Sequence, residues 1–238
     1  MSAAGNTRER GFFLLLAGLC VLTVFAGFAP SYYLKNVIHA PPPLSAMTHI
    51  HGVVFTAWVL VFLTQATLIS RGNAALHRRI GMLGVMLFGV VATVGVATAL
   101  NAGRAGHAPP GAPPPLVFMA LPLMGIAATV CLFVAAIWNR SRSEAHMRYM
   151  LAALFSMTPP ATDRLALAAG YPGVSIVFAL VMMDVLLGVA MLYDYITLKR
   201  IHPAYLWSAA VFLVTEAGVA WAFHSPAWLP FAQFVTQS

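Results

Sequence analysis

Two histidines stand at matching places in the chain, each beside arginines at the start of a long apolar stretch. His77 precedes Arg78 and Arg79, and His146 stands two residues before Arg148. Helical spacing places small residues, methionines and one phenylalanine on the face of each histidine. These are Gly81, Gly84 and Phe88 after His77, and Met150, Ala153 and Met157 after His146. Two neutral imidazoles facing such a slot are what six-coordinate haem iron requires, so the pair suggests haem b. The alternative is that each histidine only anchors its helix at the membrane surface.

Two acidic residues fall near the middle of later apolar stretches, Asp184 in one and Glu216 in the next. Ionisable side chains inside a bilayer are costly, which makes them candidates for proton relay or cation binding. The alternative is a pair of protonated carboxyl groups that merely hydrogen-bond to neighbouring helices.

The segment "MTPPATDRL" contains two consecutive prolines, Pro159 and Pro160, in the middle of an apolar stretch. Proline removes a helical hydrogen bond and clashes with the carbonyl one turn earlier, so the segment predicts a broken helix. Freed carbonyls at membrane depth need protein, water or a ligand. We expect either a kink beside a cavity or a purely structural bend, with Arg164 pairing with Asp163 or holding an anionic group.

The remaining histidines divide into a group on the expected outer side and His202 on the inner side. His51 shares a helix face with Phe55, Trp58, Phe62 and Gln65, a stripe that suits either a quinone or ordinary packing. The outer group as a whole raises a third possibility, a copper site. Its members are His39, His49, His51, His107 and His224.

The elements that must position these residues are transmembrane helices. Of the 238 residues, 61% are hydrophobic and only 8% are charged, whereas about a quarter are charged in a soluble domain. Stretches of about 20 apolar residues, long enough to cross a bilayer, recur along the chain. They predict an all-α bundle of seven spans in one integral membrane domain, residues 1–238. The spans are approximately 11–30, 48–70, 78–101, 116–138, 146–169, 173–194 and 205–224.

Basic residues predict how the bundle lies in the membrane. With the N-terminus in the cytoplasm, the inner segments carry most of the Lys and Arg, as the positive-inside rule requires. The inner set is Arg8, Arg10, Arg71, Arg78, Arg79, Arg140, Arg142, Arg148, Lys199 and Arg200, and the outer set is Lys35, Arg104 and Arg164. Seven crossings then place the C-terminus outside. We expect the first stretch to be an uncleaved span.

Several classes of function find no support in the sequence. The net charge of +7 comes from short loops between spans, so topology explains it better than nucleic-acid binding. Cys20 and Cys131 both fall inside predicted spans, where we expect packing residues and no disulfide framework. No nucleophilic triad, phosphate loop or closed zinc pattern occurs in the sequence.

Three segments resemble the signature segments of an uncharacterised bacterial family of polytopic membrane proteins. They are "LHRRIG" (76–81), "HMRYMLAALFSMTPPATDRL" (146–165) and "YDYITLKRIHPAYLW" (193–207). The likeness implies a multi-pass protein of the bacterial cytoplasmic (inner) membrane, without an established activity.

More distantly, the histidine positions resemble those of transmembrane di-haem cytochromes b. That resemblance implies an inner haem held by His77 and His146, with Arg78, Arg79 and Arg148 near its propionates. His51 matches half of an outer pair, but the fourth span contains no histidine, so His51 would serve a quinone or a metal instead. We therefore expect membrane electron transfer with a quinone or redox partner. The alternatives are a proton- or ion-coupled transporter or sensor using Asp184 and Glu216, and the outer copper site.

Overall fold

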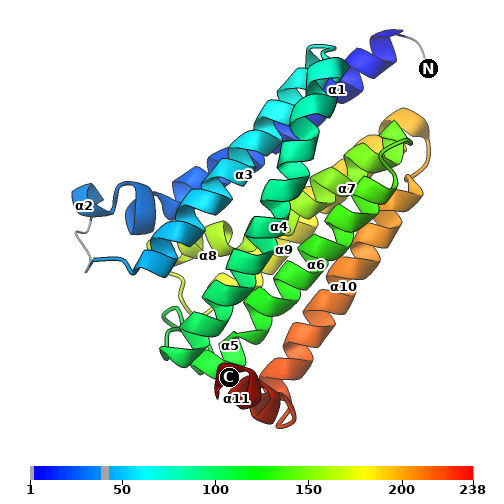
Figure 1. Ribbon diagram of the computed structural model, residues 1–238. Helices are drawn as coiled ribbons and strands as arrows, with labels where there is room; N and C mark the ends of the chain where they lie inside the picture. The colour runs from blue at the N-terminus through cyan, green and yellow to red at the C-terminus, as the bar shows by residue number, and fades with distance from the viewer. Residues whose placement is uncertain (1–2, 39–42, 238) are drawn as a thin grey trace. The chain divides into compact units, whose positions relative to one another are not determined.

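The computed structural model describes residues 3–38 and 43–237, and in these ranges the chain is helical apart from short connections (Figure 1). The all-α class is confirmed for the described residues. Within residues 3–38 and 43–237, six helices are long and apolar enough to cross a membrane, which indicates a multi-pass membrane protein. They are Arg8–Tyr33, Ala46–Ser70, Ala74–Arg104, Pro115–Trp138, Ser175–Leu198 and Pro203–His224. Each overlaps one of the predicted spans.

The remaining predicted span, 146–169, is split into two shorter helices, α7 (Ser143–Phe155) and α8 (Pro159–Ala168). Around the split the backbone bonds shorten to a three-residue spacing, with Met157 N donating to Leu154 O and Thr158 N to Phe155 O. Pro159 has no backbone N–H, so it cannot donate the next hydrogen bond of the helix. The predicted helix break is confirmed, and neither half alone has the length of a spanning helix.

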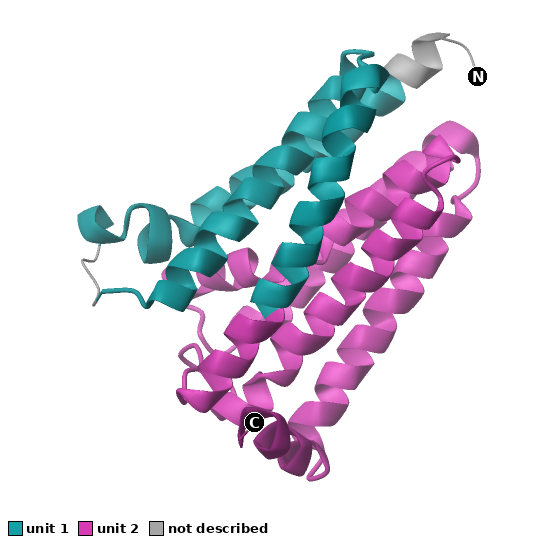
Figure 2. Cartoon of the chain, viewed as in Figure 1, with its two compact units in different colours: residues 1–95 teal, residues 96–238 magenta. Residues whose placement is uncertain are grey.

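The chain divides into two compact units, residues 1–95 and 96–238 (Figure 2). The first contains α1 (Ala3–Phe28), the π-helix η1 (Ala29–Tyr33), α2 (Lys35–Ile38), α3 (Ala46–Ser70) and the first two-thirds of α4 (Ala74–Arg104). Helix α1 packs on α3. The adjoining η1 also comes close to α3, since a Cβ at Gly52 would overlap the ring of Tyr32.

The polar and aromatic stripe of α3 packs within the first unit. Trp58, only 2% exposed, lies with its ring centroid 5.5 Å from Phe62 and 5.6 Å from Phe88 of α4. The ring of His51 stacks on Phe55 at 4.0 Å. For the aromatic part of the stripe, these contacts favour ordinary helix packing over a flat ligand.

The second unit contains α5 (Pro115–Phe118), α6 (Ala120–Trp138), α7, α8, α9 (Ser175–Leu198) and α10 (Pro203–His224). Helix α6 packs on α7 and α10, and α9 packs on α8 and α10. The contacting faces are rich in small buried residues, which let helix backbones approach closely. Among these are Ala128, Ala136, Ala152, Ala153, Ala161, Ala179, Ala190 and Ala204.

A further helix, α11 (Trp228–Gln237), follows the last predicted span. Its buried face holds Trp228 and Ala232, which pack with Met119, Ala120 and Ala222. Trp228 Nε1 donates to Leu116 O at 2.9 Å. Phe234 on the other face is exposed. Helix α11 was not predicted from the sequence, because a ten-residue amphipathic helix is too short to be recognised as a span.

Candidate functional site

The two acids expected near mid-membrane do meet in the second unit. The side chains of Asp184 of α9 and Glu216 of α10 lie close enough to interact electrostatically, and Glu216 Oε1 is buried without a hydrogen-bond partner among the described residues. An ionised carboxylate has only acceptor oxygens, so a bond between two carboxyl groups needs a proton on one of them. Because two neighbouring carboxylates repel each other, the pair favours a state with a proton on one of its two groups.

The surroundings of this acid pair are apolar. Val181 and Val185 flank Asp184 with exposures of 49% and 47%, and Leu213 and Val214 flank Glu216 with 65% and 73%. Asp184 lies on the exposed surface of the unit, whereas Oε1 of Glu216 is buried. A charged carboxylate is costly at the membrane depth that these valines and leucines imply. Sharing a proton lowers that cost, because the two groups then carry one negative charge instead of two.

A second polar cluster joins α7, α9 and the start of α10. Arg148 and Asp194 are both fully buried, and their side chains form a two-pronged ion pair. Arg148 Nε donates to Asp194 Oδ2 at 2.8 Å and its Nη2 donates to Oδ1 at 2.7 Å. Its Nη1 donates to Glu144 O at 3.0 Å, and the guanidinium lies 5.8 Å from the ring centre of Tyr205. The guanidinium predicted to face a haem propionate thus faces a carboxylate of the chain.

His202 completes this cluster at the start of α10. Its backbone N–H donates to Asp194 Oδ2 at 3.2 Å, and its side chain caps the helix, with Nδ1 accepting from Ala204 N at 3.1 Å. Burial, and then the charge of Arg148, lower the pKa of His202 below its ordinary value of 6.5. The ring is thereby held in the neutral form that can accept the capping bond.

The two histidines proposed as haem ligands lie in different units, His77 in the first and His146 in the second. Nδ1 of His146 lies 2.9 Å from Ala136 O. Because a carbonyl only accepts, Nδ1 carries the proton and Nε2 of the neutral ring keeps its lone pair. Metal-binding histidines commonly have this arrangement, so His146 fits a haem ligand.

His77 has the opposite arrangement. Oriented to match its surroundings, the Gln65 amide nitrogen donates to His77 Nδ1 at 2.6 Å and to His77 O at 3.0 Å, and its oxygen accepts from Gly81 N at 3.3 Å. Nδ1 of neutral His77 is then an acceptor and Nε2 carries the proton. An imidazole protonated at Nε2 does not bind iron through that atom, so His77 in this arrangement does not fit a haem ligand.

The other predicted site residues have varied surroundings. Arg78 and Arg79 are exposed on α4. Arg164 turns back on its own helix, where Nη1 donates to Pro160 O at 2.7 Å, and it interacts electrostatically with Asp163. At the α7–α8 break, Thr158 Oγ1 donates to Phe155 O at 2.7 Å. Thr158 N donates to the same carbonyl at 3.0 Å, so Thr158 provides both bonds to the acceptor that Pro159 cannot reach, which favours a structural bend.

Most of the outer histidines are described, and His39 lies outside the described residues. His49 and His107 are exposed, and His224 Nδ1 bonds to Ala220 O of its own helix at 2.8 Å. Within residues 3–38 and 43–237, the structure shows no group of three or more His, Cys, Asp or Glu side chains that could hold a metal ion. Copper binding stays a prediction.

Asp194 was not predicted as a site residue, and His202 was expected only to lie on the inner side of the membrane. One signal was available: an arginine inside an apolar helix needs a buried acid, and Asp194 is one of only six acidic residues in the chain.

Comparison with known proteins adds no relative: no protein-family model, curated protein or solved structure matches the chain. The family resemblance of the three signature segments stays a prediction.

Proposed function

We propose that this protein couples proton movement across the bacterial cytoplasmic membrane to a transport cycle, and that the Asp184–Glu216 pair is its proton-binding site. One observation carries the proposal. The two carboxyl groups lie near each other on adjacent helices, flanked by apolar side chains, where two negative charges would repel each other and one bound proton is favoured.

The pair can convert proton binding into helix movement. With a proton between them, the carboxyl groups hold α9 and α10 together at this level. After the proton leaves, two negative charges face each other in a medium of low dielectric constant, and their repulsion favours separation. Two states that differ in proton content and in a helix contact are the minimum that a coupled transporter or a proton sensor requires.

Two matched substitutions test the site. Asp184→Asn and Glu216→Gln keep the size and hydrogen-bonding capacity of each side chain but remove the titrating group. We expect liposomes containing the wild-type protein and a trapped pH-sensitive dye to acidify faster under an imposed potential than empty liposomes, and both variants to lose most of this flux. Glu144→Gln, which neutralises an exposed carboxylate outside the spans, is the control. Wild-type flux equal to that of empty liposomes would overturn the transport proposal.

The shared proton is tested separately with dicyclohexylcarbodiimide. This apolar reagent modifies protonated carboxyl groups within membranes, and the adduct is located by mass spectrometry of the digested protein. We expect modification of Asp184 or Glu216 at neutral pH, and none at Glu144. Protection by added sodium would identify a cation as the coupling ion. The absence of any adduct on both residues would contradict a shared proton.

Haem-b electron transfer with a quinone or redox partner is the second candidate, supported by the ring arrangement of His146. When bound, haem would supply one-electron chemistry. The Gln65–His77 contact weighs against the pair as ligands. A reduced-minus-oxidised visible spectrum of protein expressed with added haem decides the matter, because the lack of a Soret band would end this candidate.

A further inference from the structure

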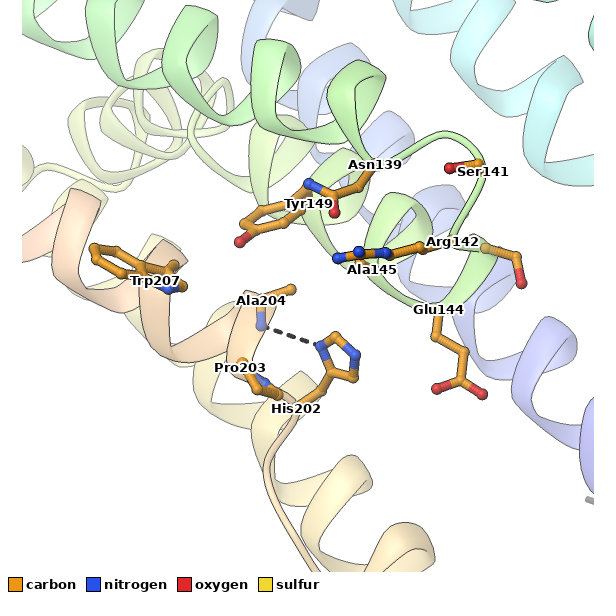
Figure 3. A pocket seen from close by; sticks show the side chains of 11 residues that line it. Asn139, Ser141, Arg142, Glu144, Ala145, Tyr149, His202, Pro203, Ala204 and Trp207 are labelled. Atoms are coloured by element: carbon orange, nitrogen blue, oxygen red, sulfur yellow. Dashed lines mark hydrogen bonds between the residues drawn. The ribbon is translucent and has the colours of Figure 1, made fainter.

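A cavity of about 620 Å³ opens where α6 turns into α7 and α10 begins, within the second unit (Figure 3). Its walls come from the turn residues, from the first turn of α7 and from the start of α10. A cavity of this size is typical of small-ligand sites. It lies apart from the Asp184–Glu216 pair, since neither acid lines it.

The cavity is polar, and its inward-pointing charge is positive. Arg142 extends into it between Tyr149 and His202, whereas the carboxylate of Glu144, also a lining residue, points away from the centre (Figure 3). His202 is held neutral by the lowered pKa described above. The first turns of α7 and α10 both border the cavity, and the positive ends of the two helix dipoles add to the potential. The combined charge suits an anion.

Aromatic side chains at the rim indicate where this anion comes from. Trp207 lines the cavity and is 67% exposed, and Trp138 at the end of α6 is 83% exposed. Exposed tryptophans at the ends of spanning helices are typical of the level of lipid headgroups. Several basic residues surround this end of the unit, among them Arg140, Lys199 and Arg200.

We propose that this cavity binds a phosphate group, carried by a phospholipid headgroup. Arg142 would contact the phosphate oxygens, because a planar guanidinium matches them with paired hydrogen bonds. The Tyr149 hydroxyl would donate a further bond, and Trp207 would lie beside the glycerol and upper acyl chains. The site would fix a lipid against the α6–α7 turn and the start of α10.

Native mass spectrometry of the detergent-purified full chain tests the proposal with two lipids that have identical acyl chains, phosphatidic acid and diacylglycerol. We expect phosphatidic acid to bind more tightly, since only this lipid carries phosphate. Arg142→Gln should weaken its binding by about tenfold, the size of losing one charge-assisted hydrogen bond, and Tyr149→Phe should weaken it less. Diacylglycerol binding should not change in either variant.

Arg140→Gln is the matched control. Arg140 is exposed in the same turn, loses the same charge when replaced and does not line the cavity. Equal effects of Arg140→Gln and Arg142→Gln, or equal binding of the two lipids, would overturn the proposal. Competition with excess inorganic phosphate distinguishes a lipid headgroup from soluble phosphate as the ligand. Displacement of phosphatidic acid would identify a phosphate site open to soluble ligands, and persistence of the lipid would support the headgroup.

Discussion

Asp194 accepts three hydrogen bonds, two from the Arg148 guanidinium and one from the backbone N–H of His202. At the residue scale, this is what makes a fully buried charge tolerable, because its oxygens exchange water for charged and polar donors. His202 adds a titrating group to the cluster, with Nδ1 as the acceptor that caps α10. Only the neutral ring can accept this bond. The start of α10 should therefore respond to acid.

We predict that the folded protein loses stability as the pH falls below about 6.5, the ordinary value for histidine. The pKa of His202 is lowered in the folded protein, so the unfolded chain takes up the proton first and acid favours unfolding. His202→Asn keeps an acceptor at the cap but does not titrate. Melting temperatures of both proteins in detergent, recorded between neutral and mildly acidic pH, check this. Parallel pH profiles for the two would contradict it.

At the element scale, the second unit depends on interactions between helices that are distant in the sequence. Helix α7 ends at the proline break, so it cannot rely on a continuous helix for its position. The Arg148–Asp194 pair ties it to α9, and the small residues of α6 and α7 allow close packing on its other side. The ion pair therefore fixes the position of α7, which the helix interrupted at Pro159 and Pro160 cannot do.

Breaking the Arg148–Asp194 ion pair should destabilise the folded protein. We predict that Asp194→Asn lowers the free energy of unfolding by about 3–5 kcal/mol, because it leaves the Arg148 charge buried without a counter-charge. The double replacement Arg148→Met with Asp194→Leu should recover much of the loss, because it removes both charges and keeps the volume. Arg140→Gln, at an exposed site, should stay within about 0.5 kcal/mol of wild type. Unfolding midpoints in mixed-detergent titrations give these values, and a double variant no better than Asp194→Asn would be inconsistent with an electrostatic role.

At the scale of the whole molecule, the side of the membrane that each end faces depends on α7 and α8. Among the residues that the structure describes, six helices are long and apolar enough to cross the bilayer, and six crossings would leave both ends of the chain on one side. The predicted arrangement, with the N-terminus inside and the C-terminus outside, requires α7 and α8 together to make a seventh crossing. Together they extend from Ser143 to Ala168, which is long enough for one crossing.

Fusions at the C-terminus decide between the two topologies. We predict that alkaline phosphatase fused after residue 238 is active, because it reaches the outer side, and that a fluorescent protein fused there is dark. The same reporters fused in the 139–142 turn, which carries Arg140 and Arg142, should give the reverse result. A bright C-terminal fluorescent fusion would show that α7 and α8 do not complete a crossing.

Much of this arrangement follows from the sequence by itself. A stretch of about 20 apolar residues has one stable backbone in a bilayer, a helix that satisfies its own polar groups, so composition and length identify the spans. The break at Pro159 follows from the missing N–H of proline. The acids Asp184 and Glu216 are recognisable as candidates because charge is costly at their depth.

Only the tertiary structure decided which polar groups are partners. Arg148 and Asp194 stand 46 residues apart, and helical periodicity gives the face of a residue without saying which helix lies against it. The same applies to the Gln65–His77 contact, which sets the proton position that a haem ligand would need. Helix α11 is positioned by the hydrogen bond from Trp228 Nε1 to Leu116 O. Partner choice depends on the rotation and packing of whole helices, and those are properties of the folded chain.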